Sequence, residues 1–258
     1  MNKLYILSSG AGGVEFITCE AKKALQECEV VVSYTKYAKE LKDYINNKEL
    51  YTSGMTHEID RAKQAIEFAK GGKTTAIISN GDVNVFGMAT LIVELIDEAD
   101  LWDKIELVSL PGVTSFLAVA SRVGAPVSQD FSIISLSDRL TDIDLIDKRV
   151  KMALECDMVI GIYNPLSKTR FKPYQHFLNA LKKHKNKIAI IASNVGREKE
   201  QITITSTNEL ITLGINNDKI SMSTLIIVCN SNTKLTKNNL VLTPRGYLNK
   251  YDLNGNLR

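Results

Sequence analysis

Glycine, asparagine, serine and charged residues gather where short apolar runs of this sequence end. Six such segments occur, and each follows a run typical of a β-strand. Exposed backbone N–H groups, amides and guanidinium groups of this kind bind polar and anionic small molecules. Since ligands of open α/β sheets bind beyond the carboxyl ends of the strands, the segments together predict one composite ligand site. They are residues 8–13, 79–88, 110–115, 163–170, 194–198 and 243–247.

The first segment carries glycines that could bring the main chain close to a ligand. Gly10 and Gly12 fit the start of a dinucleotide-binding loop, but Glu15 stands where that loop needs a third glycine. The segment also lacks the Lys-Ser or Lys-Thr pair of a nucleotide P-loop. It therefore predicts either a ligand contact or a tight turn, and the sequence leaves both open.

Asp82 in the second segment has two candidate roles. It precedes a stretch at helical spacing, residues 85–99, so it could cap a helix by accepting backbone N–H bonds. It could instead line a pocket together with Asn80 and Gly81, with Val85 as an apolar wall. The sequence does not choose between these roles.

Four cationic residues in the later segments are candidates for binding carboxylate groups. Arginine suits this task because its planar fork matches a carboxylate. The alternative for each residue is a solvated loop or a structural ion pair, and Glu198 could neutralise its neighbour. The candidates are Lys168, Arg170, Arg197 and Arg245.

These segments require a scaffold of alternating strands and helices, which predicts the α/β class with a mostly parallel sheet. A mixed, α+β-leaning second half is expected because its last two strands read as a hairpin. Pro111-Gly112 marks the best boundary, giving domains of residues 1–112 and 113–258. We expect strands at residues 4–8, 30–33, 74–79, 105–110, 131–136, 158–163, 188–193, 201–206, 225–229 and 240–243. We expect helices at residues 18–26, 59–69, 85–99, 115–122, 143–154 and 174–183.

The composition is that of an ordinary globular protein. The chain has 258 residues, of which 44% are hydrophobic and 24% charged, and its net charge is +3. This charge is too small to indicate nucleic-acid binding, although it suits an anionic substrate. No run approaches the roughly 18 apolar residues of a membrane span, and no signal peptide is apparent, so we expect a cytoplasmic protein. The four cysteines form no CxxC pair and the three histidines do not cluster with them, so we expect reduced thiols and no metal site.

At the six segments the sequence resembles the tetrapyrrole methylases, which are S-adenosylmethionine-dependent enzymes of cobalamin and siroheme synthesis. The resemblance spans nearly the whole chain, in the family's order. Within the family the chain is most similar to the C17-methyltransferases that contract the corrin ring. The motifs of that branch are Ile134-Ser135-Leu136-Ser137-Asp138, Tyr163-Asn164-Pro165 with Ser167-Lys168 and Arg170, Gly196-Arg197-Glu198, and Thr243-Pro244-Arg245-Gly246-Tyr247.

The resemblance implies a homodimer of two α/β domains, with the active site in the cleft between the domains. It implies S-adenosyl-L-methionine as cofactor, S-adenosyl-L-homocysteine as its product, and a precorrin tetrapyrrole substrate methylated at C17 with ring contraction. Positions matching the family's cofactor contacts are Asn80, Gly81, Asp82, Val85, Thr114, Ser115, Tyr163, Asn164, Asn194 and Val195. Positions expected on the tetrapyrrole side are Gly10, Gly12, Lys168, Arg170, Arg197 and Arg245.

The first two loops depart from the family's pattern. Ser8, Ala11 and Gly13 stand where the family usually has Gly, Pro and Asp, and Val83-Asn84 replaces Pro-Gly. The missing acid at position 13 puts an acid–base role for that position in doubt. The missing prolines remove rigidity rather than reacting groups, so we still expect activity.

Two chemical questions stay open in the sequence. Methyl transfer from a sulfonium needs alignment more than acid–base catalysis, but ring contraction moves protons, and Ser137, Asp138 and Tyr163 are unassigned candidates for that step. The cobalt-bearing and metal-free substrates are also not distinguished, although we favour the cobalt branch. The alternatives are a methylase acting at another ring carbon and a non-catalytic tetrapyrrole-binding protein on the same fold. An RNA methylase is disfavoured by the weak net charge.

Overall fold

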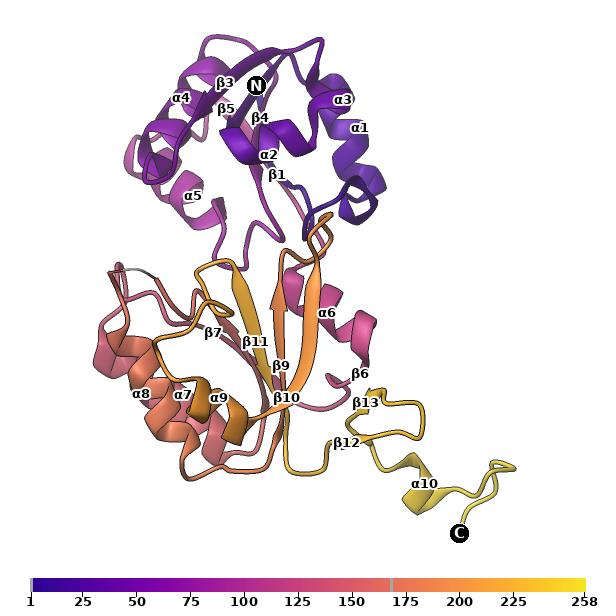
Figure 1. The fold of residues 1–258 in the computed structure, drawn as a ribbon. Helices are drawn as coiled ribbons and strands as arrows, with labels where there is room; N and C mark the ends of the chain where they lie inside the picture. Colours follow the sequence, from indigo (N-terminus) through magenta and orange to yellow (C-terminus); the bar gives the residue numbers. More distant parts are fainter. Residues whose placement is uncertain (1, 168) are drawn as a thin grey trace. The chain divides into compact units, whose positions relative to one another are not determined.

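The computed structural model describes residues 2–167 and 169–258 (Figure 1). The chain divides into two compact units, of which the first ends at Ser115 and the second begins at Phe116. Each unit is built on its own five-stranded sheet, and the second carries a further three-stranded sheet. The candidate anchor Lys168 lies outside the described residues.

The first unit contains a parallel sheet of five strands. Every strand pairing in it is parallel, as expected from the alternation of strands and helices. In spatial order the strands are β3 (Glu49–Ser53), β2 (Val30–Tyr34), β4 (Thr75–Ser79), β1 (Asn2–Ser8) and β5 (Ile105–Leu110).

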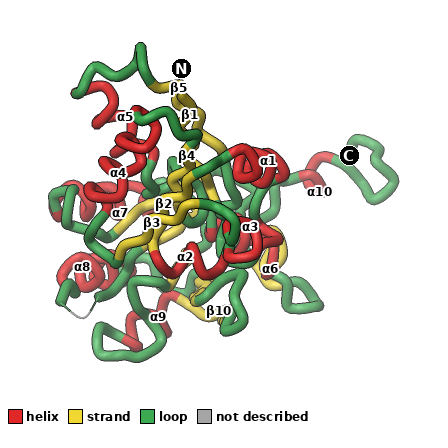
Figure 2. Tube along the Cα trace, turned by 90° about the horizontal axis from the view of Figure 1, so that it is seen from above, coloured by secondary structure: helices red, strands yellow, loops and turns green. Residues whose placement is uncertain are grey.

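Helices cover both faces of this sheet because successive strand residues point in opposite directions. Leu4 and Ile6 face the core under one pair of helices, whereas Tyr5 and Leu7 face the core under the other helices. The first pair is α4 (Glu58–Lys70) and α5 (Ala89–Glu98). The others are α1 (Cys19–Glu27), α2 (Thr35–Glu40) and α3 (Lys42–Ile45), preceded by the 3-10 turn η1 (Val14–Phe16). Figure 2 shows α2 alongside the edge strand β3, which it contacts.

The second unit contains a mixed sheet, as predicted. Strands β7 and β8 are parallel, whereas β11 runs antiparallel to both β8 and β9, and β10 runs antiparallel to β9. The two flanking strands β8 and β9 therefore run in the same direction. In spatial order the strands are β10 (Gln201–Ser206), β9 (Ile188–Ser193), β11 (Thr224–Val228), β8 (Val159–Tyr163) and β7 (Phe131–Ser135).

One face of the second sheet packs on three helices and the other on α6. The three are α7 (Ile143–Glu155), α8 (Lys172–Leu181) and α9 (Thr207–Leu213), which share one apolar core with the sheet. Helix α6 (Ser115–Val123) approaches β8 closely at Gly161, where an added Cβ would lie 2.5 Å from the ring of Phe116. Gly161 therefore forms a notch in β8 that admits this ring.

The expected hairpin between the last two strands is wrong. Strand β11 is buried along its whole length, which suits a central strand, and it pairs with β9 and β8. The final strand, β13, belongs instead to the small sheet. One of its partners there, β12, comes from the polar stretch that the sequence suggested was a turn. That sheet contains β12 (Lys234–Leu235), β13 (Val241–Leu242) and β6 (Gly124–Ala125), and α10 (Tyr247–Lys250) follows it.

The helix expected over residues 85–99 begins later, at Ala89. Phe86 adopts a left-handed φ of 55°. Gly87 packs so tightly that an added Cβ would lie 2.6 Å from the carbonyl oxygen of Val83. Residues 85–88 therefore form a loop where the apolar spacing predicted a helix. Asp82 is not a helix cap, because the residue before α5 is Met88.

Candidate functional site

Three of the predicted segments meet at the carboxyl edge of the first sheet, because β4, β1 and β5 are neighbours there. Gly10 N donates to Gly81 O (3.1 Å), and Gly81 N donates to Gly10 O (2.7 Å). Ser8 Oγ donates to Leu110 O (2.6 Å) and accepts from Val83 N (3.0 Å). The loops after the three strands therefore form one continuous surface.

Glycine is required where these loops approach most closely. A Cβ on Gly112 would lie 2.4 Å from the carbonyl oxygen of Gly81 and 2.4 Å from the Cβ of Ser8. Gly81 itself is different, since a Cβ there would meet, among the described residues, only the Cα of Thr114 at 3.8 Å. Gly81 is buried and has a left-handed φ of 70°, so it turns the main chain in a conformation that residues with a side chain rarely adopt.

Asp82 links the loop after β4 to the loop after β5. Its Oδ1 accepts from Asn84 N (2.8 Å) and its Oδ2 accepts from Gly112 N (2.9 Å). A carboxylate can accept about four hydrogen bonds, so capacity remains for a ligand. The other predicted residues of this region are also present here: Thr114 and Gly12 are buried, and Asn80, Val85 and Ser115 are half-buried.

The carboxyl ends of β7, β8 and β9 share one edge of the second sheet, because these strands run in the same direction. Leu136 N donates to Tyr163 O (2.9 Å) across the ends of β7 and β8. Asn164 Nδ2 donates to Ser135 Oγ (3.0 Å) at the same place. The predicted Tyr-Asn pair therefore lies against the segment that follows β7.

Arg170 faces into the protein rather than towards solvent. Its Nε lies 3.2 Å from Asp138 Oδ1, and its Nη1 donates to Ser137 Oγ (3.3 Å). The side chain is only 12% exposed. Two of its nitrogens are thus engaged by the segment after β7, and the fork is not open to a carboxylate in this arrangement.

Tyr163 holds the beginning of α6. Phe116 N, in the first turn of that helix, donates to Tyr163 Oη (2.9 Å). A helix leaves its first N–H groups without internal partners, so this hydroxyl satisfies one of them. The sequence candidates for proton transfer, Ser137, Asp138 and Tyr163, all have structural partners.

Two asparagines turn the chain sharply after β8 and β9, which run in the same direction on either side of β11. Asn164 follows β8 with a φ of 52°, and Asn194 follows β9 with a φ of 53°. Asparagine adopts this left-handed conformation more readily than other residues with side chains. Both predicted positions thus present their main chain at the same edge of the sheet.

The loop after β9 is closed by an acid that sequence reasoning missed. Glu200 Oε2 accepts from Gly196 N (2.7 Å), and its Oε1 lies 3.5 Å from Arg122 Nε. Arg197 Nη1 donates to the carbonyl oxygen of Val195 (3.4 Å). In the sequence, the only indication of this hydrogen bond is the spacing of four residues between Gly196 and Glu200.

Arg245 is not brought together with Arg170 and Arg197. The preceding residue, Pro244, accepts through its carbonyl oxygen from Gln129 Nε2 (2.8 Å). Gln129 precedes β7, so this contact lies at the amino edge of the second sheet, opposite the strand-end loops. Arg245 is exposed there.

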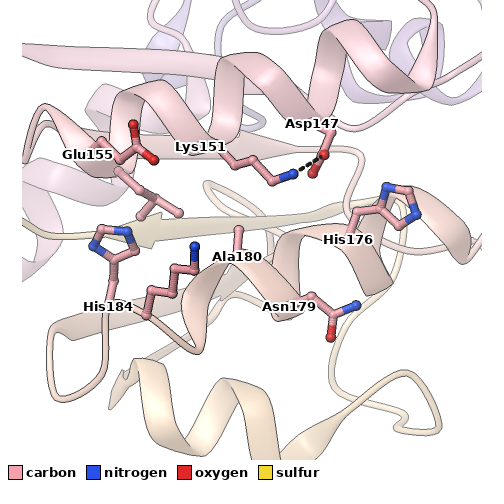
Figure 3. Close-up of a pocket in the computed structure, with 9 residues that line it drawn as sticks. Asp147, Lys151, Glu155, His176, Asn179, Ala180 and His184 are labelled. Carbon is pink, nitrogen blue, oxygen red and sulfur yellow. Dashed lines mark hydrogen bonds and ion pairs between the residues drawn. The ribbon is translucent and has the colours of Figure 1, made fainter.

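A separate cavity of about 390 Å³ lies between α7 and α8 (Figure 3). Side chains of both charges line it, and Lys151 Nζ donates to Asp147 Oδ2 (2.5 Å) at its wall. Glu155 and His184 lie towards the opposite end from Asp147 and His176. None of the predicted site residues that the structure describes lines this cavity.

Other reactive groups do not assemble into a centre. Within residues 2–167 and 169–258, no three His, Cys, Asp or Glu side chains are placed to hold a metal ion. Burial raises the pKa of the Cys28 and Cys229 thiols to about 12, so both are unreactive at neutral pH. Cys19 and Cys156 are exposed free thiols.

No helix in the described part of the chain is long and apolar enough to cross a membrane.

Comparison with known proteins decides the family. Residues 3–211 match the Tetrapyrrole (Corrin/Porphyrin) Methylases. The chain belongs to this family. The resemblance and the fold class predicted from the sequence are therefore confirmed.

Relatives in this methylase family are similar to this chain over nearly its whole length. The probable cobalt-factor III C(17)-methyltransferase of Methanocaldococcus jannaschii is 39% identical over 254 residues, covering 97% of this chain and 100% of that protein. The cobalt-factor III methyltransferase of Priestia megaterium is 36% identical over 258 residues, covering 98% of this chain. This chain spans about half of that relative's length, 46%.

Solved structures show the same methylase architecture. The crystal structure of the methyltransferase CobJ has a TM-score of 0.86 at 28% identity, covering 95% of this chain and 100% of that one. A cobalt precorrin-4 methyltransferase, CbiF, has a TM-score of 0.67 at 20% identity, which shows the shared fold alone. The strand-end loops described above are therefore the loops of a tetrapyrrole methylase.

Proposed function

We propose that this chain is an S-adenosylmethionine-dependent C-methyltransferase of cobalamin biosynthesis. Its reaction is methylation of C17 of (cobalt-)precorrin-3 with contraction of the ring. The observation that carries this proposal is the 39% identity to a probable cobalt-factor III C(17)-methyltransferase across both full chains. The cobalt in that name favours the cobalt-bearing substrate, in which the metal is part of the substrate rather than a resident cofactor.

The loops of the first unit fit S-adenosylmethionine. The cofactor supplies a methyl group already activated on a positively charged sulfur, so the protein has to bind it, align it and exclude water. Gly81 turns the main chain sharply after β4, Asp82 retains acceptor capacity that suits a positive charge, and Val85 adds apolar surface. The proposed cofactor residues are Asn80, Gly81, Asp82, Val85, Thr114 and Ser115 in the first unit, with Tyr163, Asn164, Asn194 and Val195 in the second.

A tetrapyrrole fringed with carboxylates needs N–H and cationic donors. Gly10, Gly12, Lys168 and Arg197 remain the proposed contacts for this substrate. Arg170 is engaged with Asp138, and Arg245 lies at the other edge of its sheet, so the structure supports these two less. Arg245→Ala tests the point: a raised KM for the tetrapyrrole with unchanged cofactor affinity would restore Arg245 as an anchor.

The assembly and cellular place of the enzyme are also proposals. We propose a cytoplasmic homodimer, which follows from the family resemblance, and light scattering of the purified chain tests its mass. The domain boundary proposed between Gly112 and Val113 is supported by the division of the chain near Ser115.

The test of function is an anaerobic incubation with S-adenosylmethionine carrying a labelled methyl group. Cobalt-precorrin-3 and its metal-free counterpart are offered separately, and products are analysed by mass spectrometry and carbon NMR. We expect one labelled methyl group at C17 of a ring-contracted product, with the cobalt substrate preferred.

Other outcomes assign other functions. A labelled methyl group at another carbon would identify a methylase of different position. Absence of transfer, together with no binding of S-adenosylhomocysteine at millimolar concentration, would identify a non-catalytic tetrapyrrole-binding protein. Label transferred only to protein or RNA would overturn the substrate class.

A further inference from the structure

The segments after β7 and β8 are held together by a group that we call the loop clamp: Ser137, Asp138 and Arg170. Arg170 belongs to the segment after β8, whereas Ser137 and Asp138 belong to the segment after β7. The ion pair joins Arg170 Nε to Asp138 Oδ1 (3.2 Å), and Nη1 donates to Ser137 Oγ (3.3 Å). The clamp therefore connects two loops at the edge where the proposed cofactor residues Tyr163 and Asn164 lie.

The clamp is a poor device for stability alone. Asp138 meets the guanidinium through Nε only, whereas the strongest arginine–carboxylate pairs are bidentate. The remaining nitrogen, Nη2, is buried and finds no hydrogen-bond partner among the described residues. A buried donor left unsatisfied opposes folding, so its presence in a native protein calls for an explanation other than stability. The pairing thus suggests a role in function rather than in stability.

Arg170 transmits this restraint to the residues that end β8. Its main chain closes a turn with Ser167, since Arg170 N donates to Ser167 Oγ (2.9 Å) and Ser167 N donates to Arg170 O (3.2 Å). Between Ser167 and Asn164 lie only Pro165 and Leu166, which are both buried. A fixed Arg170 therefore fixes the far end of a short turn that begins at Asn164.

Asn164 needs such support because its conformation is strained. Its φ of 52° is left-handed, and that region disfavours residues with a Cβ. Its amide also donates to the hydroxyl of Ser135, the last residue of β7 (3.0 Å). The end of β7 and the clamped turn thus hold Asn164 from both sides, and loosening the clamp would release one of them.

We propose that Asp138 is a positioning residue that acts through Arg170 to hold Tyr163 and Asn164 in the conformation that binds the cofactor. This inference rests on the proposed function. It gives Asp138 a role in binding rather than in proton transfer.

The same sheet provides a matched control at its other edge. Asp157 precedes β8 and forms an ion pair with Lys187, which precedes β9. These side chains are 38% and 10% exposed, against 29% and 12% for Asp138 and Arg170. Asp157 also accepts from Ser231 N (3.0 Å) and Ser231 Oγ (2.5 Å). This second pair joins strand starts and lies away from the proposed ligand loops.

The experiment measures the dissociation constant of S-adenosylhomocysteine by calorimetry and the Tm for five proteins. They are the wild type, D138N, D138E, the double variant D138L/R170M and the control D157N. The double variant removes both charges, so it leaves no unpaired buried cation and should retain its fold even if D138N does not.

We expect D138N and D138L/R170M to raise the dissociation constant about tenfold, the scale at which altered loop positioning changes ligand affinity. The double variant should do so with a Tm near that of the wild type. D138E should recover most of the affinity by restoring the charge. D157N should lower the Tm and leave the dissociation constant unchanged.

Three results overturn the inference. The first is an unchanged dissociation constant in both D138N and the double variant. The second is a loss of affinity that follows the loss of Tm across all variants, D157N included. The third is a loss of turnover in D138N with normal affinity and a shifted pH profile, which would assign Asp138 to proton transfer. Failure of the wild type itself to bind S-adenosylhomocysteine would instead overturn the proposed function, and this inference with it.

Discussion

The loops after β1 and β4 are joined by reciprocal main-chain hydrogen bonds and pack tightly against Gly112 after β5, whereas the loops after β7 and β8 are joined mainly through side chains. In the first region Gly10 and Gly81 exchange backbone hydrogen bonds, and Gly112 has no room for a Cβ. In the second, Arg170 and Asp138 form an ion pair between the loops. Main-chain contacts tolerate no added volume, while side-chain contacts depend on charge and hydrogen bonding. The two regions should therefore fail under different substitutions.

The largest expected effect is that of Gly112→Ala. The new Cβ would lie 2.4 Å from the carbonyl oxygen of Gly81, in the loop after β4, and 2.4 Å from the Cβ of Ser8, at the end of β1, so all three segments would have to move. We expect the free energy of unfolding to fall by about 3 kcal/mol, at the upper end for overpacking. Urea denaturation measures it. Gly54→Ala is the control, because a Cβ at Gly54 meets no described atom within 4 Å; an equal loss there would contradict the argument.

Asp82→Ala should have the next largest effect and should separate binding from stability. It leaves the N–H groups of Asn84 and Gly112 without their acceptor, which costs about 1–3 kcal/mol. We expect S-adenosylhomocysteine affinity to fall about tenfold as well, equivalent to about 1.4 kcal/mol. Calorimetry and thermal denaturation measure both quantities. If only stability falls, Asp82 holds loops together and does not contact the cofactor.

Asn164 allows conformation and side-chain contact to be separated in the second region. Asn164→Gly keeps the left-handed turn and loses the hydrogen bond to Ser135, whereas Asn164→Ala loses both. We therefore expect Asn164→Ala to be less stable than Asn164→Gly by about 1 kcal/mol, the preference of that conformation for glycine. Equal Tm values for the two variants would show that the turn is not under strain.

The smallest effect concerns the opposite edge of the second sheet and appears only in acid. Burial alone would raise the pKa of Asp157, but hydrogen bonds from Lys187 and Ser231 outweigh it and hold that pKa below its ordinary 3.8. The folded state then binds fewer protons than the unfolded state, so this stabilisation is present above pH 3.8 and is lost as the pH falls through the lowered pKa. The free energy of unfolding, measured from pH 5 to pH 2, should fall less steeply in Asp157→Asn. Parallel curves would contradict the pKa shift.

Local pattern was sufficient to predict most of this fold. The strands at residues 188–193 and 201–206 lie where spacing and β-branched residues predict them, because each is bounded by polar or turn-forming residues. The strand-end rule also located the loops of the first unit, which meet because parallel strands place their carboxyl ends together.

The sequence could not predict features set by distant partners. Nothing near Arg170 shows that its guanidinium turns inward to Asp138, and nothing near Arg245 shows that its loop bonds to Gln129. The position of β11 at the centre of its sheet likewise depends on strands far along the chain. The left-handed Phe86 was hidden by apolar spacing that suits a helix equally well.

The notch at Gly161 is one of two contacts by which strand β8 holds the beginning of α6. The ring of Phe116 rests in that notch on the face of β8, and the Tyr163 hydroxyl at the end of the same strand receives the Phe116 N–H. A shift of the turn that follows Tyr163 would therefore pull directly on the first turn of α6. Binding of the cofactor at the loop after β8 should therefore change the rate of amide hydrogen exchange at the beginning of that helix.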